Sequence, residues 1–182
     1  MIIAQEKRKS NISEYILYMW QIEDLIRALD FDMDKIQKTI VSQFKTDDYT
    51  RSKISDWYTN LVKMMEKEFI KKEGHLQFLV NLTNELNRFH IALFQSNEDL
   101  VYNNLYHTAK PAIDDFKIKS HMKDASDIYA ALQSLYSIMI LHLMKKEISK
   151  DTTEAIKQIS HFLAYISSRF KQYEEGDLDI VF

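Results

Sequence analysis

The side chains that could do chemistry in this chain are few and far apart. Six histidines are the main candidates for acid–base or metal chemistry: His75, His90, His107, His121, His142 and His161. No two of them lie three to five residues apart, and none follows an acidic residue at an interval of three. Metal sites in helical proteins use those spacings because they place two ligands on one helix face. The sequence therefore predicts no metal centre and no cofactor.

The most informative polar group lies in the first long predicted helix, where Trp20, Glu23 and Arg27 border a wide apolar arc. Glu followed by Arg four residues later is a favourable pair on a helix. A buried pair needs further partners, because an uncompensated charge in a core is costly. Two interpretations stay open: a structural ion pair at a helix–helix contact, favoured without a demonstrated cavity, and one wall of a small pocket.

Two histidines share a helix face with apolar residues and are expected to point inward. His90 lies within the stripe of Leu86 and Leu93, and His142 shares a face with Leu135. A lone histidine on an apolar face is usually a satisfied core residue, and that interpretation is favoured over a ligand or acid–base role. In the alternative interpretation, the candidate pocket between the central helices is lined by Trp20, Glu23, Arg27, His90 and His142.

Helices must position these residues, because the chain has two glycines and one proline in 182 residues. Average usage would give about thirteen glycines and nine prolines. Those residues mark tight turns, strand ends and phosphate-binding loops. Gly74 and Gly176 are isolated, so no glycine-rich nucleotide loop or nucleophile elbow can be written. The sequence therefore predicts an all-α protein.

Apolar residues at helical spacing, together with capping residues, predict six or seven helices, four or five of them long. The expected segments are about 11–29, 35–45, 48–72, 76–95, 97 to the region of Pro111, 124–144 and 151–175. We expect them to pack as one antiparallel helical bundle, a single domain over residues 1–182.

Some of these helices carry more specific expectations. The helix at 11–29 is apolar around more than half of its circumference, and the helix from 124 is apolar nearly all round at residues 135–144, which predicts a central place for both. Pro111 is expected to break the fifth helix, because proline disfavours helical geometry in the residue before it. Gly74 is expected to end the third helix as a left-handed residue.

The charge balance argues against two classes of partner. A net charge of −3 and a pI near 6.1 give no general attraction to nucleic acid or to anionic lipid. The lysine clusters at 7–9 and 117–123 are interpreted as solvated faces, and a nucleic-acid interpretation would require salt-dependent binding. With no cysteine, no signal peptide and no apolar run of roughly 18 residues, the chain is expected to be cytoplasmic, with no membrane partner.

The C-terminal tail, residues 174–182, has the alternation of an extended strand. Leu178, Ile180 and Phe182 alternate with Asp177, Asp179 and Val181. The favoured interpretation is a tail that folds back over the bundle. The alternative is a docking peptide that inserts into a partner protein or into a second copy of this chain.

The start of the chain resembles a family of bacterial proteins. The residues that carry the resemblance are MIIAQEKRKSNI at 1–12 and EYILYMWQIED at 14–24. They are similar to the opening of an uncharacterised family of about this length, which is known only as a domain of unknown function. The resemblance implies an all-helical fold and a bacterial cytoplasmic protein, and it carries no activity.

Two classes of function follow from these observations. The leading hypothesis is a non-enzymatic interaction or structural protein, plausible as a homodimer, that works through a helix face or through its tail. The alternative is a small-ligand binder or an enzyme with a pocket between the central helices.

Overall fold

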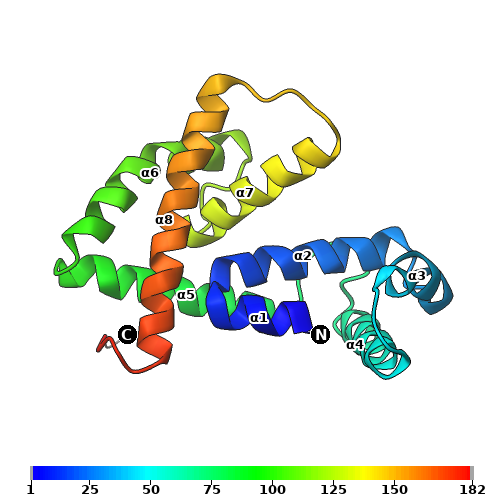
Figure 1. Cartoon of the computed structure of the whole chain (residues 1–182). Coiled ribbons are helices and arrows are strands. Elements are labelled where there is room, and N and C mark those ends of the chain that lie inside the picture. The colour runs from blue at the N-terminus through cyan, green and yellow to red at the C-terminus, as the bar shows by residue number, and fades with distance from the viewer. Residues whose placement is uncertain (1, 181–182) are drawn as a thin grey trace.

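The computed structural model of the chain describes residues 2–180, which form eight α-helices, one 3-10 helix and no strand (Figure 1). The elements are α1 (Ile2–Ser10), α2 (Ile12–Ala28), α3 (Met33–Thr39), η1 (Val41–Gln43), α4 (Asp48–Lys67), α5 (Gln77–Ser96), α6 (Leu100–Lys119), α7 (Asp127–Leu143) and α8 (Lys150–Glu174). The all-α fold class is confirmed. The helices number more than the six or seven expected, because the N-terminal residues form a helix of their own before Asn11.

Short polar side chains explain where most of the helices begin. Asn11, Asp47 and Asp99 each precede a helix, and each accepts a hydrogen bond from the backbone N–H three residues later. Ser126 and Ser149 do the same before α7 and α8. Such caps satisfy N–H groups that have no partner inside the helix.

The third predicted helix, α4, ends five residues earlier than expected, at Lys67 instead of Lys72. Phe69 takes the left-handed conformation, with φ of 59°, and the N–H of Ile70 bonds back to the carbonyl of Met65. This pattern closes a helix without a glycine. Gly74, with φ of 91°, lies in the loop that follows, so its predicted role as the cap of this helix is wrong.

Pro111 does not break the fifth long helix, contrary to expectation, and α6 runs through it from Leu100 to Lys119. Pro111 and His107, the residue whose carbonyl loses its helical partner, are both exposed. Ala109 and Ile113 on the opposite side are fully buried. Packing of that side against α7 and α8 outweighs the local preference of proline.

In Figure 1, α8 runs down the middle of the molecule in the direction opposite to α6, which lies along it, and α7 lies on its other side. The helix α2 contacts α1, α5, α7 and α8, which confirms its predicted central place. The α3–α4 segment extends from the far end of α2 (Figure 1). None of the helices within residues 2–180 combines the length and the apolar character needed to cross a bilayer.

The second helix predicted to be central, α7, is buried only along its first half. Ile128, Leu132 and Tyr136 are buried, whereas Leu143 and Met144 are 72% and 59% exposed. The last turns of α7 extend beyond its neighbours toward the loop that leads to α8 (Figure 1). Apolar periodicity shows which residues avoid water but not how far the neighbouring helices reach.

The C-terminal tail folds back, as the favoured interpretation predicted for its described part. Leu178 and Ile180 are half-buried and pack against the core. Phe182 lies outside the described residues.

His90 points into the core between α5, α6 and α8, as predicted. It is 5% exposed, and its ring lies 4.7 Å from that of Tyr106 and 5.7 Å from that of Phe162. The Nδ1 atom is hydrogen-bonded to the hydroxyl of Tyr102. Burial, which penalises the charged imidazolium, lowers the pKa of His90 to about 4. His90 is therefore a hydrogen-bonded core residue.

This burial predicts an acid-sensitive stability. Above pH 6.5 the His90 imidazole is neutral in both states, whereas between pH 6.5 and about 4 only the unfolded chain takes up the proton. The free energy of unfolding should therefore fall by about 3 kcal/mol across that window because of this one residue. Urea denaturation at several pH values measures the fall, and His90→Gln, which keeps a partner for Tyr102, should remove that part of it. An equal pH dependence in His90→Gln and in the exposed control His161→Gln would contradict this account.

Candidate functional site

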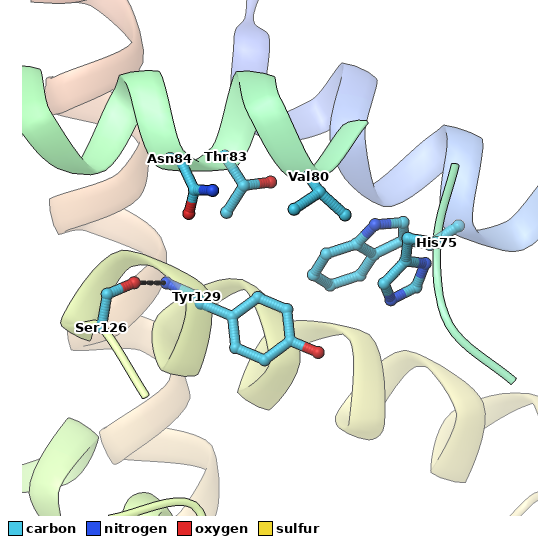
Figure 2. A pocket seen from close by; sticks show the side chains of 7 residues that line it. His75, Val80, Thr83, Asn84, Ser126 and Tyr129 are labelled. Atoms are coloured by element: carbon cyan, nitrogen blue, oxygen red, sulfur yellow. Dashed lines mark hydrogen bonds between the residues drawn. The ribbon is translucent and has the colours of Figure 1, made fainter. Parts of the chain in front are cut away.

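A pocket with a volume of about 240 Å³ lies between α5 and α7, where α2 reaches them. Its lining residues are Trp20 of α2, His75 of the loop before α5, Val80, Thr83 and Asn84 of α5, and Ser126 and Tyr129 at the start of α7. In Figure 2, the residues of α5 form one wall and those of α7 the opposite wall, with His75 at one end. Of the five residues predicted to line a pocket, only Trp20 does so.

Trp20 forms the aromatic centre of this region and is 1% exposed. Its ring stacks on that of His75, with centroids 4.3 Å apart and an interplanar angle of 15°. Tyr129 and Tyr136 of α7 meet it edge-on, at 5.8 Å and 5.6 Å. Such offset and edge-on contacts are the favoured arrangements of aromatic rings.

Glu23, one turn after Trp20, is fully buried and holds His75 in place. Its Oε2 atom is 2.6 Å from Nδ1 of His75, and its Oε1 atom accepts the backbone N–H of Leu76 at 2.8 Å. Leu76 is the N-cap of α5 and has no polar side chain for that role. The carboxylate of Glu23 therefore caps α5 from another helix, where the positive end of the helix dipole favours a negative charge.

Arg27 does not pair with Glu23; the predicted ion pair is replaced by an ion pair with Asp24 on the same helix and by contacts to a loop. Its Nη1 atom lies 2.8 Å from Oδ1 of Asp24, and its guanidinium donates to the carbonyls of Ile70 and Gly74. These carbonyls belong to the same loop that carries His75. Arg27 and Glu23 thus hold the two ends of residues 70–76 against α2, and Arg27 stays outside the pocket.

Tyr136 fastens α7 to α2 beside the pocket. Its hydroxyl donates to the carboxylate of Asp24 and lies 3.3 Å from the carbonyl of Trp20. Burial raises the pKa of Tyr136 above its ordinary value, and the hydrogen bond to Asp24 raises it further. The phenol therefore stays a donor throughout the ordinary pH range.

The other two predicted pocket residues lie elsewhere. His90 is in the core between α5, α6 and α8, and His142 is exposed near the end of α7. The predicted inward orientation of His142 is wrong, because α7 extends beyond its neighbouring helices at that end. His75, which the sequence reasoning missed, stands in a loop without helical periodicity. The one local signal for His75 is its position next to Leu76, the N-cap of α5. Leu76 has no polar side chain, so a side chain from elsewhere must supply the acceptor.

The geometry prepares His75 for hydrogen bonding or proton transfer. A carboxylate only accepts hydrogen bonds, so Nδ1 carries the proton and Nε2 is left for the pocket. An imidazole oriented by a carboxylate is half of the arrangement found in nucleophilic catalysis. The other half is missing among the described residues: Thr83 donates to the carbonyl of Leu79, Ser126 accepts from the N–H of Tyr129, and neither hydroxyl is bonded to His75.

The indole N–H of Trp20 is also unsatisfied. It is buried, and no acceptor within residues 2–180 is hydrogen-bonded to it. A buried donor without a partner costs free energy, and because this nitrogen has almost no accessible surface it is enclosed by the protein. Within the same residues, no group of three or more acidic or histidine side chains could hold a metal ion.

The double role of Glu23 predicts a large effect on stability. Glu23→Ala leaves the N–H of Leu76 and the ring of His75 without their acceptor in a buried place, and should destabilise the fold by about 3 kcal/mol. Glu23→Gln keeps an acceptor and should cost about 1 kcal/mol. Urea denaturation at neutral pH compares both with Glu66→Ala, which removes an exposed ion pair. An Ala variant no less stable than this control would refute the role assigned to Glu23.

Comparison with known proteins places the chain in a family. The model of the family DUF4924, described as a domain of unknown function, matches residues 1–177. No curated protein and no solved structure matches the chain. Because the match spans nearly its whole length, and in agreement with the resemblance in its first helix, the chain belongs to the DUF4924 family of domains of unknown function.

Proposed function

We propose that this protein binds a small molecule in the pocket between α2, α5 and α7. The observation that carries the proposal is the cavity itself, which is lined by Trp20 and by an imidazole, that of His75, oriented by a buried carboxylate. Binding sites are typically concave and mostly apolar, with a few well-placed polar groups. The pocket meets this description.

The size of the pocket limits the ligand. Its volume of about 240 Å³ exceeds that of an engineered cavity of roughly 150 Å³ that binds benzene. It falls short of the roughly 300 Å³ at which pockets for drug-sized ligands begin. A compound built on one ring fits this range. Binding is favoured over catalysis because the described pocket lacks a nucleophile bonded to His75.

A second concave surface is larger but gives weaker support. It lies between α1 and the η1–α4 segment and has a volume of about 800 Å³. Ile3, Tyr49 and Trp57 supply its apolar lining, and Lys45 and Lys53 part of its polar lining. Long flexible lysines at a surface orient a ligand less well than a clamped imidazole does.

Filling the pocket should abolish ligand binding. Val80→Phe places a larger side chain against the cavity, whereas Val101→Phe adds the same group at a position that is 56% exposed on α6. In a Trp57→Phe background, Trp20 gives the only indole signal in proton–nitrogen correlation spectra. Adding a library of single-ring fragments should shift that signal in the background protein and in Val101→Phe, but not in Val80→Phe. A Trp20 signal that no fragment shifts would overturn the proposal.

Self-association is a second candidate function, favoured by the exposed end of α7. Leu141, Leu143 and Met144, at the last turn of α7 and its C-cap, are 37%, 72% and 59% exposed. Contiguous apolar surface of this kind often marks a protein–protein contact. We propose that this end of α7 joins two copies of the chain in a homodimer.

Charges at this surface should separate the two copies. Leu143→Asp combined with Met144→Asp should convert a dimer into a monomer in sedimentation experiments. The melting temperature at low protein concentration should stay unchanged, because both positions are exposed in the single chain. An unmodified chain that sediments as a monomer at high concentration would rule out this second function.

The absence of cysteine supports a reducing compartment, and the similarity in the first helix supports a bacterial source. We therefore propose the bacterial cytoplasm as the place where this protein acts.

A further inference from the structure

We propose that the C-terminal tail occupies a peptide-docking groove of its own chain. The tail groove lies between the end of α5, the start of α6 and the end of α8. When the tail leaves, the groove takes an extended segment of another protein, in which large apolar residues alternate with polar ones. The groove is separate from the pocket between α5 and α7, so this inference does not depend on the proposed ligand binding.

The tail enters the groove through a tight reversal at the end of α8 (Figure 1). Gly176 takes the left-handed conformation, with φ of 80°, and the N–H of Asp177 bonds back to the carbonyl of Gln172 at 2.8 Å. This pattern closes the helix and turns the chain back. Leu178 and Ile180 then pack against the core, whereas Asp177 and Asp179 are exposed. The side of the tail that contacts the protein is therefore apolar.

Apolar contact alone holds this part of the tail. Within the described residues, the backbone and side chains of residues 178–180 make no hydrogen bond and no ion pair. Leaving the groove therefore costs these residues no polar contact with the protein. Local opening of so few contacts requires little free energy, and an extended segment with similar apolar residues can take the place of the tail.

The groove extends beyond the tail. Two hollows adjoin Asp179 and Ile180, one of about 570 Å³ along α5 and one of about 550 Å³ beside α6 and α8. Apolar side chains in these hollows remain in water: Ile91 is 44%, Leu100 68% and Val101 56% exposed. Clustered apolar surface of this kind often marks a protein contact. An occupant longer than the tail would cover it.

The charges of the groove do not select a strongly charged partner. Arg169 is paired with Asp99, with 2.9 Å between Nε and Oδ2. Arg88 and Glu98, also in the lining, carry opposite charges and are exposed. The lining is thus balanced, so the apolar side chains of the partner segment provide its affinity. Its polar residues face water, as Asp177 and Asp179 of the tail do.

The tether of the tail decides between another protein and a second copy of this chain. A short flexible connection presents a tail to its own groove at an effective concentration of roughly 1 mM. The tail of a second copy makes the same contacts and cannot displace the tethered one at lower concentrations. A segment that also covers Ile91 or Val101 gains contacts that the tail lacks. The occupant is therefore a longer segment of another protein.

A labelled peptide of residues 175–182 tests the groove. In Leu178→Ser combined with Ile180→Ser, the tail loses its apolar side chains and the groove is left open. The peptide should bind this open variant at least about ten-fold more tightly than the natural chain, because the tethered tail no longer competes. Fluorescence anisotropy measures the difference. Asp177→Ser combined with Asp179→Ser changes exposed residues of the same tail and should behave like the natural chain.

Methyl signals in nuclear magnetic resonance spectra of the natural chain provide a second measurement, which decides the question if the open variant does not fold. Millimolar peptide should shift the signals of Leu178 and Ile180 toward those of an unfolded chain, because the peptide replaces the tail. Equal binding of the peptide to a folded open variant and to the natural chain would overturn the docking groove. Unchanged methyl signals at millimolar peptide would do the same.

Longer peptides test the partner. Probes extended by Leu-Ser-Leu-Ser at one end or the other are titrated into the open variant, and at least one should bind roughly ten-fold more tightly than the unextended peptide. Ile91→Asp combined with Val101→Asp should remove that gain. If neither extension helps, the longer partner is wrong. If the natural chain is a dimer in sedimentation and the open variant a monomer, the occupant is a second copy, and the choice of another protein is overturned.

Discussion

The buried carboxylate of Glu23 is the interaction on which the rest of this structure depends. It lies on α2, is fully buried and caps the first turn of α5 through the N–H of Leu76. A charge in that position is tolerated because the helix dipole, a backbone donor and an imidazole all face it. Glu68, just after α4, accepts the N–H of Gln77 from an exposed position, whereas the buried N–H of Leu76 relies on Glu23, more than fifty positions away in the chain.

The pocket is a consequence of this cap. When Glu23 holds Leu76, it also holds His75 by Nδ1, and Arg27 fixes the carbonyls of Ile70 and Gly74 in the same loop. The imidazole is thereby stacked on the ring of Trp20. A cavity of about 240 Å³ lies beside these rings, between α5 and α7. Stability and the candidate site thus share one set of contacts, a coupling common where function needs a pre-organised group.

The candidate site could be predicted from the sequence only in part. Trp20 and Glu23 were recognised because they interrupt or border an apolar arc on a strongly periodic helix, and both are buried in the structure. The partner of Glu23 was not recognised. The nearest opposite charge along the helix belongs to Arg27, which bonds instead to acceptors in a loop. The orientation of His142 was predicted wrongly, because helical periodicity indicates which side of a helix is apolar but not whether another helix covers that side. His75 stands outside any periodic segment and gives no such signal.

The sequence by itself determined the class of fold and most helix starts. Both depend on local chemistry: scarce glycine and proline, apolar spacing near 3.6 residues, and short polar side chains that cap a neighbouring turn. Only the tertiary structure decided that α6 continues through Pro111, that α7 ends in water, and that Glu23 meets His75. Those outcomes depend on side chains that come together from distant parts of the chain, where packing and hydrogen bonding outweigh the preferences of single residues.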